Sequence, residues 1–129
     1  MHRSAVRRWM ALGTAALTTS ALLALATPTA HAAAPTRCQG REVKTLDFST
    51  GVTHVHRQNG YVCALTVSRR PGVRAAMSVG VQARGGRPVT DRGSYRYHAG
   101  PITVHAGHRC VKITGTVGAG SVRTGWILC

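Results

Sequence analysis

The sequence predicts an all-β fold, a small antiparallel β-sandwich or a partly open barrel of about seven strands with two disulfides. Three observations predict this class. Apolar and polar residues alternate with a period of two almost everywhere after Arg41. Glycine-rich turn signals recur at short intervals between the alternating segments. Four cysteines follow an export signal in a short chain, which is typical of disulfide-stabilised secreted domains.

Residues 1–32 have the organisation of a secretory signal peptide, and residues 33–129 form one domain. A basic segment precedes an apolar run that ends near Ala26, and Ala30 and Ala32 occupy the small-residue positions before a cleavage site. The run is interrupted and shorter than the ~20 residues that span a bilayer, so we expect cleavage rather than an anchor. The Arg7-Arg8 pair leaves the twin-arginine route open beside the general export route.

Four strand candidates come first, near residues 42–48, 52–58, 61–68 and 74–84. Asn59-Gly60 is a strong hairpin signal, because a type I′ turn needs positive φ at both central residues. Arg70-Pro71-Gly72 predicts a type II turn before the fourth candidate. That fourth candidate has an apolar face and a polar face. The apolar face carries Ala75, Met77, Val79, Val81 and Ala83, and the polar face carries Arg74, Ser78, Gln82 and Arg84.

The remaining strand candidates lie near residues 95–98 with 102–106, 110–117 and 121–128. Ala99-Gly100-Pro101 is expected to bend the first of them, so that His105 faces outward. In the next candidate, Lys112 lies on the polar face, opposite Ile113. The segment 85–94 begins with Gly85-Gly86 and is expected to be an exposed loop.

The four cysteines predict two disulfides. Three pairings are open, and we favour the two in which each pair brackets a compact sequence block. No C-x-x-C spacing occurs, so a zinc ribbon or a thioredoxin-like site has little support. Each bridge contributes about 2–4 kcal/mol, a large share of the stability of a small domain. The favoured pairs are Cys38–Cys63 and Cys110–Cys129.

The charge of the domain is strongly positive. Without the three arginines of the leader, 14 basic residues face three acidic residues, a net charge of +11. Such a surface favours polyanions: wall polymers, anionic lipid head groups or nucleic acid. Nucleic acid is the least expected, because few aromatic residues accompany the cations. Solvated turn residues without a ligand are the alternative. The polyanion-binding candidates are Arg69, Arg70, Arg74, Arg84, Arg87, Arg92 and Arg96.

Histidines raise the question of a metal site. His54 and His56 alternate on one strand and are weak candidates for zinc or copper, with His98, His105 or His108 as further ligands. No carboxylate lies nearby in sequence to orient a ligating ring. We therefore expect neither a metal site nor a cofactor.

Catalysis has little support in the sequence. Paired-carboxylate chemistry would need two of Glu42, Asp47 and Asp91, and an undistorted strand sends the first two to opposite faces. Asp91, Ser94 and His98 form a Ser-His-Asp set on paper, without a nucleophile-elbow context. We therefore expect that the protein is not an enzyme.

A set of residues spread over nearly the whole domain matches a known family in order and spacing. These residues are Cys38-x-Gly40, Val43, Gly51-Val52, Cys63 to Val67, Tyr95, Ala99-Gly100-Pro101, Ile102-x-Val104, Gly107, Cys110-Val111 and Cys129. With them, the chain resembles the spore-associated protein A family of small secreted actinobacterial proteins. The resemblance implies a secreted, non-enzymatic protein found with spores or aerial hyphae, with no catalytic residues. Two positions depart from it, His98 and the Lys112-Ile113 pair, where aromatic residues would be expected.

The expected function is therefore attachment of a secreted, cationic protein to polyanionic polymers of the spore or cell envelope. Two alternatives stay open. One is a small, ribonuclease-like secreted hydrolase. The other is a secreted inhibitor or effector whose 85–94 loop binds a protein target. No transmembrane segment is expected after cleavage, and the oligomeric state stays open.

Overall fold

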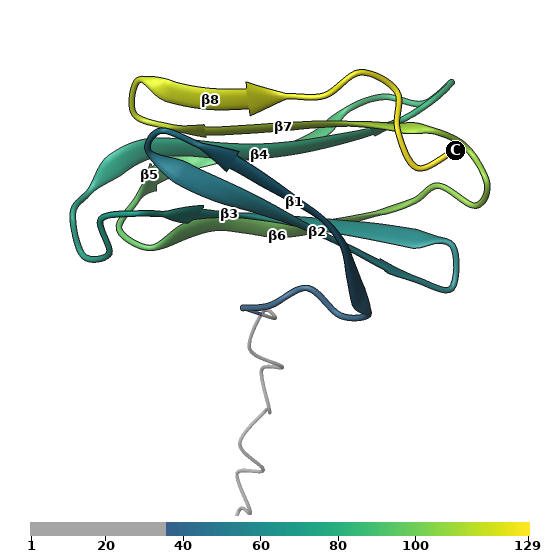
Figure 1. The fold of residues 1–129 in the computed structure, drawn as a ribbon, viewed down its shortest axis with the longest axis horizontal. Coiled ribbons are helices and arrows are strands. Elements are labelled where there is room, and N and C mark those ends of the chain that lie inside the picture. The colour runs from purple at the N-terminus through teal and green to yellow at the C-terminus, as the bar shows by residue number, and fades with distance from the viewer. Residues whose placement is uncertain (1–35) are drawn as a thin grey trace, which may run out of the picture. The chain divides into compact units, whose positions relative to one another are not determined.

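A computed structural model describes residues 36–129 as two packed antiparallel sheets of four strands each (Figure 1). Sheet A has the strand order β1-β2-β3-β6, and sheet B has the order β5-β4-β7-β8. The predicted all-β sandwich is thus confirmed. The predicted signal peptide lies outside the described residues. Within residues 36–129, no helix is long and apolar enough to cross a membrane.

Residues 36–129 form eight strands, one more than the seven candidates. Their bounds are β1 Arg41–Phe48, β2 Gly51–Gln58, β3 Tyr61–Ser68, β4 Ala75–Ala83, β5 Val89–Tyr95, β6 His98–His105, β7 Val111–Val117 and β8 Gly120–Arg123. The predicted turn chemistry is present, with φ of 50° at Asn59 and 80° at Gly60 in the β2–β3 hairpin. Gly72 has a φ of 91° in the turn that precedes β4.

The additional strand is β5, which corrects the expectation of an exposed loop over 85–94. It pairs along the whole of β4, with Asp91 opposite Val79 and Arg92 opposite Ser78. The period-two pattern was hidden because polar Asp91 and small Gly93 occupy inward positions of this strand. The loop is therefore reduced to the short connection between β4 and β5.

Two further boundaries differ from the sequence predictions. β6 runs without interruption from His98 to His105, and a register shift against β3 between Ala64 and Thr66 accommodates Gly100-Pro101. β8 ends at Arg123 rather than near residue 128. The chain then returns to β7 through an isolated bridge between Val111 and Ile127.

Small residues fill the core between the sheets. Its largest fully buried side chains are Met77, Ile113, several valines and two threonines. The threonines are Thr53 and Thr66 of sheet A, whose hydroxyl oxygens share a hydrogen bond of 2.8 Å. Gly115 of β7 faces this pair, and a Cβ there would overlap Thr53 Oγ1 and lie 2.8 Å from Thr66 Oγ1. The two sheets therefore approach each other closely at this point, where β7 has no side chain.

Both favoured disulfides are present. Cys38–Cys63 joins the segment before β1 to β3, with 5.5 Å between the Cα atoms. Cys63 pairs with His56 and Thr103 in the register, so this bridge lies on the outer face of sheet A. Cys110–Cys129 joins the end of the chain to the start of β7.

The close approach at Gly115 predicts a large penalty for one added methyl group. We expect Gly115→Ala to lower the free energy of unfolding by about 1–3 kcal/mol, because the methyl group must displace two buried, mutually bonded hydroxyls. Gly125→Ala is the matched control, because a Cβ at Gly125 meets nothing within 4 Å. Urea denaturation measures both variants, and equal stability would contradict the close packing of the sheets at this point.

Candidate functional site

The outer face of sheet B is the strongest candidate site. The alternation that points Met77, Val79 and Val81 into the core points the intervening residues outward. We call this surface the sheet B face. It is rich in hydroxyl groups and cations, and it consists of Ser78, Gly80 and Gln82 of β4, Thr90 and Arg92 of β5, Lys112, Thr114 and Thr116 of β7, and Ser121 and Arg123 of β8.

An aromatic ring extends this face at one end. Lys112 Nζ lies 4.6 Å from the ring centroid of Trp126, and Arg84 Cζ lies 5.7 Å from it. Each cation–π contact at such an accessible site contributes about 0.5–1 kcal/mol. Trp126 therefore holds two cations in place next to the hydroxyl-bearing strands.

A hollow of about 280 Å³ lies within the sheet B face. Gly80 forms its floor between Thr90 and Thr114, its register partners on the neighbouring strands. A Cβ at Gly80 would overlap Thr114 Oγ1 and lie 3.3 Å from Thr90 Oγ1. Neither hydroxyl bonds another side chain or the backbone within residues 36–129. Gln82, Lys112 and Arg123 complete the lining of this Gly80 hollow, together with Val81 and Pro88.

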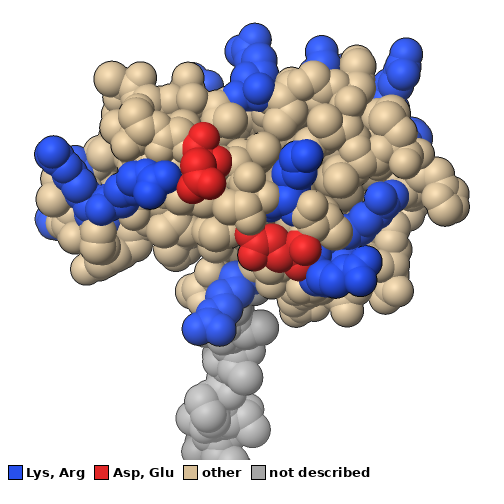
Figure 2. Space-filling view, viewed as in Figure 1, with Lys and Arg blue, Asp and Glu red and all other residues tan. Residues whose placement is uncertain are grey.

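The acidic residues are all placed away from the sheet B face. Glu42 and Asp47 belong to β1 of sheet A. Asp91 belongs to β5 but points between the sheets, where it accepts hydrogen bonds from Tyr95 Oη at 2.5 Å and from the Gly100 amide at 2.7 Å. Figure 2 shows the acidic side chains near β1, whereas basic side chains project from the β7–β8 side without acidic neighbours. The sheet B face is therefore acid-free and cationic.

The seven predicted arginines are divided among several places. Arg92 lies on the sheet B face, and Arg74 and Arg84 directly flank β4, whose strand alternation continues onto that face. Arg69 bonds Asp47 Oδ1 and the Phe48 carbonyl, each at 3.1 Å. Arg96 donates to the Gly72 carbonyl at 3.1 Å. The other two, Arg70 and Arg87, lie exposed in the connections that precede and follow β4.

Lys112, Arg123 and Trp126 belong to the site but were not among the predicted residues. The alternation of β7 already placed Lys112 on a polar face. Its role could be recognised only once β7 was known to lie beside β4, and Arg123 required β8 beside β7. These are pairings between segments distant in sequence, which local patterning does not specify.

The histidines of β2 hydrogen-bond protein groups. His54 Nδ1 lies 2.7 Å from Glu42 Oε1, so the structure supplies a carboxylate that was missing from the nearby sequence. His56 Nδ1 lies 3.1 Å from the Gly40 carbonyl oxygen. Among residues 36–129, no group of three His, Cys, Asp or Glu residues is arranged to hold a metal ion.

The carboxylates do not form a hydrolytic pair. Glu42 and Asp47 share the outer face of sheet A, because a bulge between Glu42 and Lys44 reverses the alternation that separated them in an undistorted strand. Their β2 partners, His56 and Val52, are four residues apart, roughly 13 Å along a strand. Glycosidase carboxyl pairs are about 5–9.5 Å apart.

The Ser-His-Asp set is not assembled either. Both oxygens of Asp91 are engaged by Tyr95 and Gly100. The hydrogen bond that Tyr95 Oη donates to Asp91 also raises the pKa of the Tyr95 hydroxyl, because the neighbouring carboxylate opposes its ionisation. His98 Nδ1 bonds the Gly100 carbonyl at 3.0 Å, and no hydrogen bond within residues 36–129 joins the three members.

Comparisons with known proteins add no relative. No family model, no curated protein and no solved structure matches the chain.

The Glu42 contacts predict a pH dependence. Hydrogen bonds from Thr45 Oγ1 at 2.6 Å and from His54 hold the pKa of Glu42 below its ordinary value of 4.5. Because this pKa is lowered in the folded state, the carboxylate stabilises the fold above pH 4.5, and this contribution is lost as the pH falls through the lowered pKa. We expect Thr45→Ala to raise the pKa of Glu42, as measured by NMR titration of its carboxyl carbon.

The control for this titration is Thr90→Ala, a threonine substitution on the other sheet, which should leave the pKa of Glu42 unchanged. Titration of Glu42 at 4.5 in the unmodified protein would contradict the hydrogen-bonding geometry.

Proposed function

We propose that the chain is an exported, non-enzymatic protein that attaches to polyanionic polymers of the spore or cell-envelope surface through the sheet B face. One observation carries the proposal: four strands present cations and hydroxyls on a surface that contains no carboxylate. The resemblance to spore-associated proteins makes the spore surface the first place to look. The two disulfides suit an oxidising compartment outside the cytoplasm.

The geometry supports binding to an extended polymer. Adjacent strands are about 4.8 Å apart, so charges on neighbouring strands lie within one Debye length, about 8 Å at physiological salt, whereas charges on β5 and β8 are about 14 Å apart. Arg92 of β5 and Arg123 of β8 are separated by the two central strands, whose hydroxyls fill the space between them. A chain of anionic groups crossing the strands would meet cations at both edges and hydrogen-bond donors in the middle.

The Gly80 hollow gives this face a position for one anionic group. A phosphate oxygen placed over Gly80 would accept hydrogen bonds from the Thr90 and Thr114 hydroxyls. Lys112 and Arg123 at the rim would balance its charge. Gly80 has no side chain, whereas its register partners on either side, Thr90 and Thr114, do. The phosphate oxygen can therefore approach the backbone of β4 closely at Gly80.

The experiment is a binding measurement with linear polyphosphate as the probe, using the exported form of the chain over a range of salt concentrations. We expect Arg92→Gln with Arg123→Gln to weaken binding and to lower the slope of log affinity against log salt by about two, since each lost phosphate contact lowers it by about one. Arg41→Gln with Lys44→Gln is the matched control, because it removes the same charge from exposed positions of β1.

Equal effects of the two double variants would show that net charge alone drives binding and would overturn the assignment of the face. A salt-tolerant, stoichiometric complex with an envelope protein, without binding to polyphosphate, would favour the inhibitor or effector alternative instead.

A neutral substitution tests the hollow separately from the charge. We expect Gly80→Ala to weaken polyphosphate binding about tenfold while the slope with salt changes by less than about one, because the methyl group displaces the Thr114 hydroxyl and keeps every cation. The measurement is the same salt titration, with Gly125→Ala as the control. Unchanged affinity in Gly80→Ala would mean that the polymer binds above the hollow rather than in it.

A further inference from the structure

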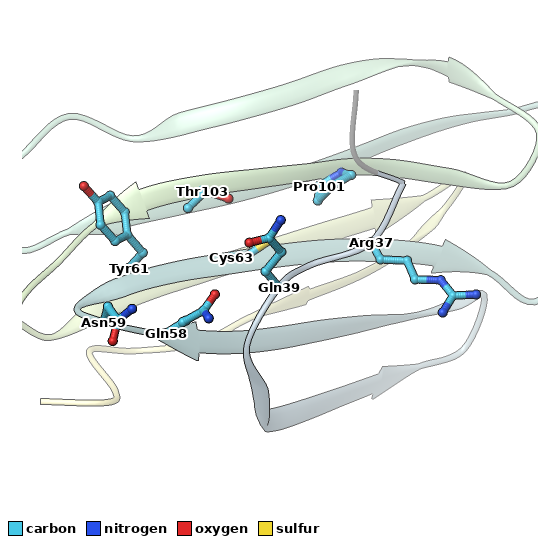
Figure 3. Close-up of a pocket in the computed structure, with 8 residues that line it drawn as sticks. All are labelled: Arg37, Gln39, Gln58, Asn59, Tyr61, Cys63, Pro101 and Thr103. Atoms are coloured by element: carbon cyan, nitrogen blue, oxygen red, sulfur yellow. The ribbon is translucent and has the colours of Figure 1, made fainter. Parts of the chain in front are cut away.

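A second hollow lies on the outer face of sheet A, between the segment before β1 and the β2–β3 hairpin. It has a volume of about 340 Å³. Figure 3 shows side chains from four parts of the chain around it. We call it the Tyr61 hollow, and its lining consists of Arg37, Gln39, Gln58, Asn59, Tyr61, Cys63, Pro101 and Thr103.

The Cys38–Cys63 disulfide builds one wall of this hollow. The bridge fixes the segment before β1 against β3, which places Gln39 beside Cys63 (Figure 3). Gly40 continues the wall in close contact with β2, because a Cβ there would lie 2.5 Å from the Arg57 carbonyl oxygen and 2.7 Å from Gln58 Cβ. Its φ of 90° also disfavours any other residue. The wall is therefore held by the disulfide at Cys38 and by close packing at Gly40.

The polar groups of the hollow are free to bind a ligand. Within residues 36–129, the side chains of Gln39, Gln58, Asn59 and Thr103 make no hydrogen bond. Each carboxamide offers both a donor and an acceptor, and the threonine hydroxyl offers both as well. Three carboxamides and a hydroxyl around one hollow match a ligand with several neighbouring hydroxyl groups, since each hydroxyl also donates and accepts.

An aromatic ring completes the hollow. Tyr61 is 49% exposed, and it packs edge-on against His105, with 4.9 Å between the ring centroids. This contact fixes the ring while leaving much of it accessible. A tyrosine ring in this position offers an apolar surface together with a polar hydroxyl. An exposed ring flanked by carboxamides suits a ligand that has both C–H faces and hydroxyl edges.

The Tyr61 hollow differs from the sheet B face in charge. Arg37 is the one charged residue in its lining, and Figure 3 shows the Arg37 side chain extending away from the other labelled residues. No carboxylate lines it. A cationic ligand therefore finds no opposite charge here, and a polyanion finds a single cation, Arg37, whose side chain extends away from the hollow. The favoured ligand is therefore uncharged.

From these features we propose that the Tyr61 hollow binds an uncharged carbohydrate, with sugar hydroxyls bonded by Gln39, Gln58 and Asn59 and a sugar ring stacked on Tyr61. This site is independent of the polyanion site, because it lies on the opposite sheet and shares no residue with it. A chain with both sites would cross-link a neutral glycan to a polyanionic polymer.

The test uses the exported form of the chain and three uncharged probes: hexamers of α-1,4-linked glucose, β-1,4-linked glucose and β-1,4-linked N-acetylglucosamine. Isothermal titration measures affinity, and amide NMR shifts locate the site. We expect at least one hexamer to bind and to shift the amides of Gln39, Tyr61 and Thr103. Tyr61→Ala and Gln39→Ala should each weaken its binding about tenfold or more. Tyr97→Ala, at an exposed tyrosine outside the hollow, should leave it unchanged.

Three outcomes would overturn the proposal: no binding of any hexamer at millimolar concentration, shifts confined to other residues, or equal losses in the Tyr61 and Tyr97 variants. The Gln39 variant keeps the test valid if Tyr61→Ala disturbs the hairpin. Arg92→Gln with Arg123→Gln should bind the hexamer normally, so failure of the carbohydrate site and failure of the polyanion site are distinguishable.

Discussion

The contact between Gly115 and the paired hydroxyls of Thr53 and Thr66 is the constraint on which the rest of the sandwich depends. Two hydroxyls buried away from water are stable only when they bond each other or another polar group. They satisfy each other across β2 and β3, and this leaves room opposite them for a residue without a side chain. Gly115 must therefore face inward. Because strand residues alternate, its neighbours Thr114 and Thr116 must face outward.

The orientation of β7 then determines the composition of the sheet B face. Lys112, Thr114 and Thr116 lie outward because Ile113, Gly115 and Val117 fill the core. β4 pairs with β7 in a register that sets Gly80 against Thr114, which creates the hollow between two threonines. The charge separation follows from the same alternation, because it directs Asp91 inward while its neighbour Arg92 points to solvent. A requirement of the core thus produces an acid-free surface.

The sequence predicted the parts of the fold that depend on local chemistry. Alternation located most strands, the Asn59-Gly60 pair specified its hairpin, and the cysteine spacing favoured the correct bridges. The alternation did not reveal β5, because a polar residue, Asp91, occupies an inward position of that strand. The inward carboxylate is stabilised by hydrogen bonds from Tyr95 and Gly100. The candidate site was less predictable. Arg92 was identified, whereas Lys112 and Arg123 join it only through pairings of β4, β7 and β8 that no local pattern encodes.

The two hollows depend on different constraints. The Gly80 hollow exists because a glycine interrupts a row of side chains on β4, a strand that is paired on both sides by β5 and β7. The Tyr61 hollow needs the segment before β1, which has no strand partner and is held by Cys38–Cys63 and the packing of Gly40. Reduction of this disulfide would release one wall of the Tyr61 hollow and leave sheet B unchanged. The oxidising environment that the disulfides suit is therefore also the condition under which both faces are complete.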